Sequence, residues 1–180
     1  MIDLTARSLP NTVRVGGKDF SINTDFRVWM QFEIELSKMK PGEYIDVRPL
    51  FKDEFPQYCS IPELLEFSRP HNELPRPISQ SKVIVYDYGL DSDLIFAAFW
   101  GQYGIDLTTV EELHWHKFLA LFNGLNESTR MREVMQYRCY EGQSTGKDRN
   151  VYEELRMAWE IVRKTPEEQQ EIDKFNGYFE

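Results

Sequence analysis

The stretch that decides the fold is Leu94-Ile-Phe-Ala-Ala-Phe-Trp100, a run of apolar residues in the second half of the chain. A helix made of these residues is apolar almost all round. Such a helix lies at the centre of a core, or has one face covered by another chain. Four aromatic residues recur at helical spacing in and just after the run: Phe96, Phe99, Trp100 and Tyr103. Core packing is the simpler explanation of this stripe, and a protein interface is the alternative.

A second helix is predicted on the carboxyl side of this run. Gly104 breaks the first helix, and Thr109-Val-Glu-Glu112 has the form of a capping box. We expect the helix that follows it to place His114 on its packed face and His116 on its solvated face. The broad apolar face of this helix consists of Val110, His114, Phe118, Leu121 and Leu125, with Trp115, Leu119 and Phe122 beside it.

The pattern then predicts another short helix. Gly124 is a candidate C-cap for the preceding helix, and Asn126–Thr129 supplies cap residues for a helix through about Tyr137. Residues 82–138 are therefore predicted to form the helical core of the protein.

The carboxy-terminal part is predicted to be a polar loop followed by helices. Residues 142–150 are polar and contain glycine, which is typical of a mobile loop. An amphipathic stripe follows, formed by Val151, Leu155, Ala158, Trp159 and Val162. Thr165-Pro-Glu-Glu168 is another capping box, with proline at the first helical position. We expect the helices of residues 150–180 to pack back on the core or to reach toward another subunit.

A short β-hairpin is predicted near the amino terminus, over residues 12–22. Val13 and Val15 alternate with polar residues before Gly16-Gly17, and Phe20 and Ile22 alternate after it. Glycine adopts the positive φ angles that a tight hairpin turn requires. Because two strands alone are only marginally stable, the hairpin must pack on another element.

The segment between the hairpin and the central run predicts two helices separated by irregular chain. Asn23, Thr24 and Asp25 can cap an amphipathic helix that extends to about Lys38. Residues 41–58 are predicted to be a loop, Ser60-Ile-Pro-Glu63 opens a short helix through Phe67, and residues 69–81, which contain three prolines, are a linker candidate.

Taken together, these patterns predict a single domain over residues 1–180. Its fold is mainly α, or α+β at most: a compact multi-helix bundle with an N-terminal β-hairpin. The length is that of one domain and suffices to bury a core.

The composition excludes several classes of protein. The net charge of −9 argues against a general nucleic-acid binder, which needs a basic surface to displace counterions from phosphates. Only two cysteines occur, Cys59 and Cys139, so we expect reduced thiols in a cytosolic protein rather than a disulfide scaffold. Residues 1–5 do not resemble a signal peptide, and the longest apolar run is far shorter than the ~20 residues of a membrane helix.

The motifs that carry enzyme or metal chemistry are missing from the sequence. His114-x-His116 has the wrong spacing for a zinc pair on one helix face, which needs i and i+4. Asp87, Asp91 and Asp93 fail the calcium-loop pattern, and we expect them to act as helix N-terminal charges instead. Phosphate-binding glycine loops and the serine elbow are absent as well. We therefore predict no catalytic, cofactor-binding or metal-binding residues.

The second half of the chain resembles a family of phage and prophage proteins, the gene-product-fifteen proteins. The resemblance is carried by residues 83–93, 95–99, 103–107, 113–121 and 135–138, with weaker matches at 23–27, 29 and 32–36. Its most specific part is Tyr103-Gly-Ile-Asp-Leu107 followed by Leu113-His-Trp-His-Lys-Phe118. Residues 139–180 add little to it.

This resemblance implies a role in the assembly of phage tails. The family is encoded among tail genes close to the gene of the tape-measure protein, a position typical of tail assembly chaperones. It implies a non-enzymatic chaperone in the host bacterial cytoplasm that binds the tape-measure protein, with the tail-tube protein as a second partner. The alternative is a structural completion or connector protein that is retained in the virion. Whether the chain forms a homo-oligomer is left open. The candidate partner-binding residues are Phe96, Trp100, Tyr103, Trp115 and Trp159.

Overall fold

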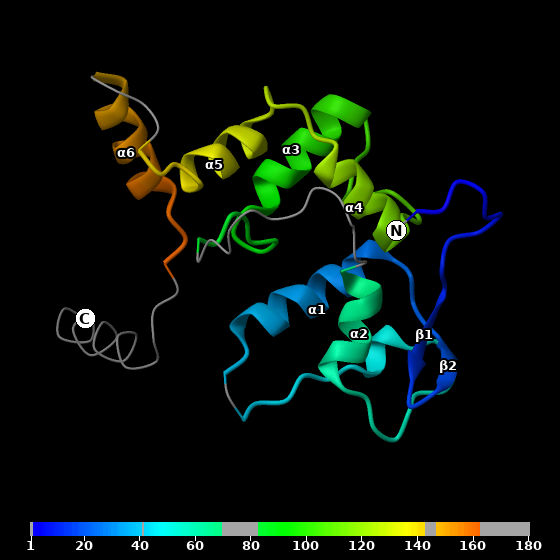
Figure 1. The fold of residues 1–180 in the computed structure, drawn as a ribbon. Helices are drawn as coiled ribbons and strands as arrows, with labels where there is room; N and C mark the ends of the chain where they lie inside the picture. The colour runs from blue at the N-terminus through cyan, green and yellow to red at the C-terminus, as the bar shows by residue number, and fades with distance from the viewer. Residues whose placement is uncertain (1, 41, 70–82, 143–146, 163–180) are drawn as a thin grey trace, which may run out of the picture. The chain divides into compact units, whose positions relative to one another are not determined.

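The computed structural model describes residues 2–40, 42–69, 83–142 and 147–162 (Figure 1). Within these ranges it contains an antiparallel hairpin of β1 (Thr12–Val15) and β2 (Lys18–Ser21), and a short 3-10 helix η1 (Arg48–Leu50). The α-helices of the same ranges are α1 (Phe26–Lys38), α2 (Ile61–Ser68), α3 (Ser92–Tyr103), α4 (Trp115–Asn123), α5 (Arg130–Arg138) and α6 (Lys147–Trp159). The prediction of a mainly helical protein with an N-terminal hairpin is confirmed.

The chain divides into two units. The first comprises residues 1–82 and 87–133, and the second comprises residues 83–86 and 134–180. We describe each unit by itself, and the single domain expected for residues 1–180 stays a prediction.

The hairpin of the first unit follows from its glycine turn. Gly16 and Gly17 have φ angles of 56° and 83°, which residues with a Cβ rarely adopt. The turn sets a register in which Val13 faces Phe20, and it buries Val13 and Val15 on one face. The predicted hairpin of residues 12–22 is thereby confirmed.

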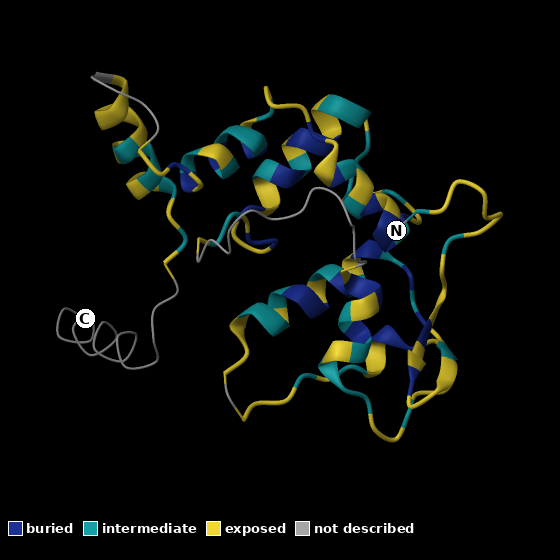
Figure 2. Ribbon diagram, viewed as in Figure 1, coloured by how far each residue is buried: buried dark blue, intermediate teal, exposed yellow. Residues whose placement is uncertain are grey.

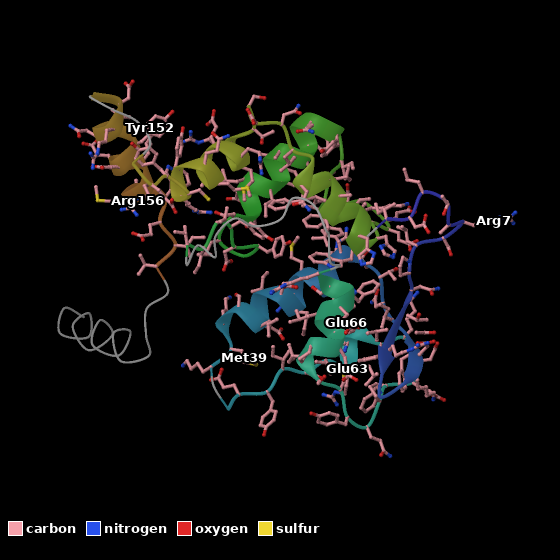
Figure 3. The ribbon with its side chains drawn as sticks, viewed as in Figure 1. Arg7, Met39, Glu63, Glu66, Tyr152 and Arg156 are labelled. Atoms are coloured by element: carbon pink, nitrogen blue, oxygen red, sulfur yellow. The ribbon has the colours of Figure 1, made fainter. Side chains whose placement is uncertain are left out.

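Helix α2 holds the hairpin turn in place. Ser60 and Glu63 form the expected capping box, in which Oε2 of Glu63 accepts a hydrogen bond from the backbone N–H of Ser60 at 2.9 Å. The other carboxylate oxygen, Oε1, accepts a hydrogen bond from the backbone N–H of Gly16, also at 2.9 Å. Glu63 is labelled in Figure 3. The hydrogen bond from Gly16, followed by those from Ser60, lowers the pKa of Glu63. One side chain therefore caps a helix and anchors a turn distant in sequence.

The predicted loop of residues 41–58 contains one ordered turn. Leu50 at the end of η1 is buried, and its carbonyl accepts a hydrogen bond from Asn23 at 2.8 Å. Phe51 forms an isolated antiparallel bridge with Ile22, which is fully buried. This part of the loop therefore continues the pairing of the hairpin and belongs to the core.

Helix α1 begins where the sequence predicts. The side chain of Asp25 accepts a hydrogen bond from the backbone N–H of Arg27 at 2.9 Å and so caps the helix. Its inner face buries Phe26, Trp29 and Phe32. The amphipathic pattern of this segment is thus confirmed as a core-facing helix.

Helix α4 begins later than the capping box at residues 109–112 predicts, so that prediction is wrong. The backbone at His114 is extended and pairs with Asp25 as an isolated antiparallel bridge. Two hydrogen bonds fix it: Phe26 donates to the carbonyl of Leu113 at 2.9 Å, and Trp115 donates to the carbonyl of Thr24 at 2.7 Å. Because these groups are engaged in pairing with a distant segment, the helix starts only at Trp115.

The core of the first unit is built from stacked aromatic rings around Phe118. This side chain is fully buried, and its ring lies 5.2 Å from Phe26, 5.0 Å from Phe99 and 5.5 Å from Trp115, measured between centroids. The rings of all three pairs are nearly parallel. Helix α4 therefore packs against both α1 and α3, with Phe118 at the centre of the shared core. Figure 1 labels the three helices.

A buried polar cluster connects the end of α2 to α1. Glu33 is 7% exposed, and its carboxylate accepts hydrogen bonds from the hydroxyl of Ser68 and the guanidinium of Arg69. Burial of a carboxylate is tolerated only where such donors replace the lost water. The predicted linker of residues 69–81 begins at this cluster with Arg69, and its remaining residues lie outside the described residues.

The second unit is held together by Arg138 at the end of α5. This side chain is buried, and it donates to the carbonyl oxygens of Trp159 at 2.7 Å and of Val85 at 3.1 Å. It thereby ties the carboxyl end of α6 to the extended residues 83–86. Helix α6 already begins at Lys147, so the predicted loop of residues 142–150 is wrong for its second half.

Candidate partner-binding surface

The structure offers no metal centre among the residues it describes. No group of three or more His, Cys, Asp or Glu side chains there could hold a metal ion. Cys59 and Cys139 are both thiols outside any disulfide, and burial raises the pKa of the Cys59 thiol to about 11, with Glu63 as a smaller cause. At neutral pH this thiol is therefore almost entirely protonated and a poor nucleophile.

The two histidines of the His114-x-His116 pair serve the backbone. His114 is the N-cap of α4, and its Nδ1 accepts a hydrogen bond from the backbone N–H of His116 at 3.0 Å. His116 is buried, stacks on Phe67 at 4.4 Å between ring centroids, and donates from Nε2 to the Phe67 carbonyl at 2.9 Å. The predicted assignment of a packed His114 and a solvated His116 is therefore wrong, because the helix begins one residue after His114.

The acidic residues before α3 order the turn that leads into the helix, and Asp91 at its N-cap makes no side-chain hydrogen bond to the first turn. Asp87 accepts hydrogen bonds from the backbone of Gly89 and Leu90, and Asp91 accepts one from the backbone of Asp87 at 2.9 Å. Asp93 lies in the first turn of α3. The expectation that these acids complement a helix N-terminus is confirmed for Asp93 by its position.

Helix α3 is apolar on its exposed face as well as on its buried face. It buries Ile95, Ala98 and Phe99 against the core, whereas Ala97, Trp100 and Gly101 are exposed. Trp100 is 55% exposed, and Leu90, just before the helix, is 73% exposed. We refer to Leu90, Phe96, Ala97, Trp100 and Gly101 as the α3 face. Exposed apolar patches of this kind mark sites of protein interaction.

A groove of about 310 Å³ runs beside the α3 face. Ala97, Ala98 and Gly101 form one wall, and Asn126 and residues 128–130 contribute to the other. Gln102 crosses between the walls: it donates to the Gly124 carbonyl at 3.0 Å and accepts from the backbone N–H of Asn126 at 2.8 Å. The small side chains leave the α3 backbone open, since a Cβ added at Gly101 would meet nothing within 4 Å.

The structure places the predicted partner-binding residues in different environments. Phe96 is half-buried and stacks with the exposed Trp100 at 6.4 Å between ring centroids. Tyr103 is half-buried and donates its hydroxyl to the carbonyl of Leu121 at 2.8 Å. Trp115 is 1% exposed and donates its indole N–H to the Ser68 carbonyl at 2.8 Å. Trp115 is therefore a core residue and contributes nothing to an exposed surface.

The fifth predicted residue, Trp159, belongs to the second unit. It is half-buried at the end of α6, where its carbonyl accepts the hydrogen bond from Arg138. No described residue of α6 is buried (Figure 2), although its sequence is amphipathic. The helix therefore exposes apolar side chains of the amphipathic stripe that we expected to pack on the core or against another subunit.

Sequence reasoning missed the small residues of the α3 face. It selected aromatic side chains, whereas the groove depends on Ala97 and Gly101, four positions apart on one helix face. That spacing, within a run that is apolar all round, is the signal that marks a helix side open to close approach.

Fold and surface together define a mainly helical protein whose described part holds no metal-ligand cluster and exposes an apolar helix face. The profile of the family described as Bacteriophage Gp15 protein matches residues 45–161, well over half of the chain. The chain belongs to this family. No curated protein and no solved structure matches the chain. None of the described helices is long and apolar enough to cross a membrane.

Proposed function

We propose that the chain is a tail assembly chaperone that binds the tape-measure protein of its phage in the host bacterial cytoplasm. The observation that carries this proposal is membership of the Gp15 family over residues 45–161, because this family is associated with phage tails and is not known for enzymes. The tail-tube protein is a second partner that the same role implies.

The α3 face supports this role by its shape and chemistry. A helical client binds by laying an apolar face into an apolar groove on its partner. The groove has a wall of small side chains at Ala97 and Gly101, and Trp100 next to it supplies a large, half-exposed aromatic anchor. An acidic protein of net charge −9 keeps such a complex in solution.

The test is co-expression of the chain with the tape-measure protein of the same phage, followed by purification and mass measurement of the complex. The wild type is expected to keep the tape-measure protein soluble and to bind it in several copies. Trp100→Ala and Gly101→Leu are expected to lose this complex while keeping the helical circular dichroism of the wild type.

A matched control is available at Tyr44, an aromatic side chain that is 99% exposed and lies outside the groove. Tyr44→Ala is expected to bind as the wild type does. A tape-measure protein that stays insoluble, together with stoichiometric amounts of this chain in finished virions, would refute the chaperone role and support the structural completion or connector protein.

A further inference from the structure

The hairpin of β1 and β2 has one closed edge and one open edge. Beyond β2, the backbone N–H of Lys52 donates to the carbonyl of Ser21 at 3.1 Å, so residues 51 and 52 continue the sheet. Beyond β1, the described part of the chain supplies no further strand. An open edge presents unpaired backbone N–H and C=O groups, which can pair with a strand of another chain.

Two residues of β1, Thr12 and Arg14, direct their backbone groups toward the open side. Inside the hairpin, Ile22 donates to the carbonyl of Asn11 at 3.0 Å, and hydrogen-bonded pairs recur at every second residue, so residues 11, 13 and 15 bond to the β2 side. Thr12 and Arg14 are exposed, and their backbone groups have no hydrogen bond within the described residues. We call these two residues the β1 edge.

Side chains close the outer side of the strand at both ends of the β1 edge. At one end, the carboxylate of Glu63 accepts a hydrogen bond from the N–H of Gly16 at 2.9 Å. At the other end, His114 donates from Nε2 to the carbonyl of Pro10 at 2.9 Å, and proline has no N–H to offer. The open stretch is therefore sharply bounded and consists of two N–H and two C=O groups.

We propose that the β1 edge pairs antiparallel with the β1 edge of a second copy of this chain, about a two-fold axis. Three alignments bring outward-facing residues opposite each other. Arg14 opposite the partner's Arg14 places like charges across the pair, which is destabilising. Thr12 opposite the partner's Thr12 sets Arg14 against a proline without an N–H. Thr12 opposite the partner's Arg14 satisfies the β1 edges of both copies with four backbone hydrogen bonds.

The side chains fit this alignment as well. Val13 comes to lie opposite the partner's Val13 on the axis, on the face of the strand that the core buries. On the exposed face, Arg14 pairs with Asp19 at 2.8 Å, so its charge is compensated within its own copy. Residues 12–15 contain neither the lysine nor the proline by which edges commonly resist pairing. This inference rests on residues other than the α3 face and does not depend on the proposed function.

Amide hydrogen exchange, measured residue by residue by nuclear magnetic resonance at increasing protein concentration, tests the pairing. The dimer is expected to be weak and reversible, because an edge of two residues buries little area. The amides of Thr12 and Arg14 should exchange about ten-fold more slowly once roughly nine in ten copies are paired, since only the unpaired tenth exchanges freely. The amides of Val13 and Val15 already bond to β2 and should not change with concentration.

A disulfide trap tests the alignment even when few copies are paired. Val13→Cys and Val15→Cys are a matched pair in a background of Cys59→Ser and Cys139→Ser, because both valines are buried on the same face of β1. The alignment places the two copies of residue 13 opposite each other, with Cβ atoms about 4.5–5.5 Å apart. It places the two copies of residue 15 roughly 13 Å apart along the strands, too far for a disulfide. Oxidised glutathione should therefore link Val13→Cys into dimers and leave Val15→Cys monomeric.

Thr12→Pro and Thr12→Val separate the backbone donor from the side chain. Proline removes one N–H at an edge position that tolerates it, and this variant should lose both the concentration dependence and the Val13→Cys link. Valine keeps the N–H and should behave as the wild type, and unaltered exchange of the α4 amides shows that each variant is folded. The proposal is overturned if Val13→Cys links no faster than Val15→Cys, or if Thr12→Pro still forms the dimer. Slow exchange of the Thr12 and Arg14 amides at every dilution also overturns it, because the edge would then be covered within one chain.

Discussion

Trp100 and Trp115 allow the same substitution to be made in two environments. The side chain of Trp115 is 1% exposed, lies 5.5 Å from the ring of Phe118 and donates its N–H to the Ser68 carbonyl at 2.8 Å. The side chain of Trp100 is 55% exposed and stacks only with Phe96 among the ring contacts of the described residues. Replacement by alanine should therefore separate core packing from surface exposure.

The expected losses of unfolding free energy differ by several kcal/mol. Burial of a tryptophan side chain removes about 150–250 Å² of surface from water, which corresponds to roughly 4–6 kcal/mol of favourable transfer free energy. Truncations of this kind in protein cores cost about 3–5 kcal/mol, and we expect that loss for Trp115→Ala. For Trp100→Ala we expect about 1 kcal/mol, because much of the side chain is already in water and alanine is the better helix former.

The assay is urea unfolding followed by far-ultraviolet circular dichroism, which does not depend on tryptophan fluorescence. A total stability of about 5–15 kcal/mol is typical, so Trp115→Ala is expected to lower the midpoint strongly and Trp100→Ala only slightly. If Trp115→Ala is too unstable to purify, Trp115→Phe keeps a ring but removes the N–H donor and should cost about 1–3 kcal/mol. Equal losses for the two alanine variants, or a larger loss at Trp100, would refute the placement of these residues.

Three further predictions concern pH, a buried ion pair and a helix terminus. Burial lowers the pKa of His116, and also that of His114, below the ordinary value of 6.5. As the pH falls, the histidines of the unfolded chain bind protons before those of the folded protein do. The contribution of these histidines to the free energy of unfolding is therefore fully present above pH 6.5 and decreases as the pH drops below it. Thermal unfolding should show a melting temperature that falls with pH in this range, and His116→Leu should make that dependence weaker. Arg69→Ala removes a partner of the buried Glu33 and should cost about 1–2 kcal/mol in urea unfolding, discounted because Arg69 is largely exposed. Gly104 ends α3 with a φ angle of 65°, which a residue with a Cβ adopts only at a cost. Gly104→Ala should therefore lower the free energy of unfolding by about 1 kcal/mol in the same assay. An unchanged free energy of unfolding would show that α3 can end in another conformation.

The sequence by itself determined the elements whose signals lie within a few residues of one another. Gly16-Gly17 predicted the hairpin, Asp25 the start of α1, and Ser60 with Glu63 the start of α2. Gly104 marked the end of α3 in the same way. Each of these signals works through hydrogen bonds or φ angles of neighbouring residues, so no knowledge of the tertiary structure is needed to interpret them.

Only the tertiary structure decided where α4 begins and which tryptophans are exposed. The segment around His114 pairs with Asp25, which is 89 positions earlier in the chain, and this pairing overrides the local capping box. Trp100 and Trp115 look alike in sequence, since both lie in apolar helical patterns, yet one is exposed and the other is covered by Phe118 and Ser68. Burial depends on contacts between distant segments, and periodicity identifies a helix face without telling what covers it.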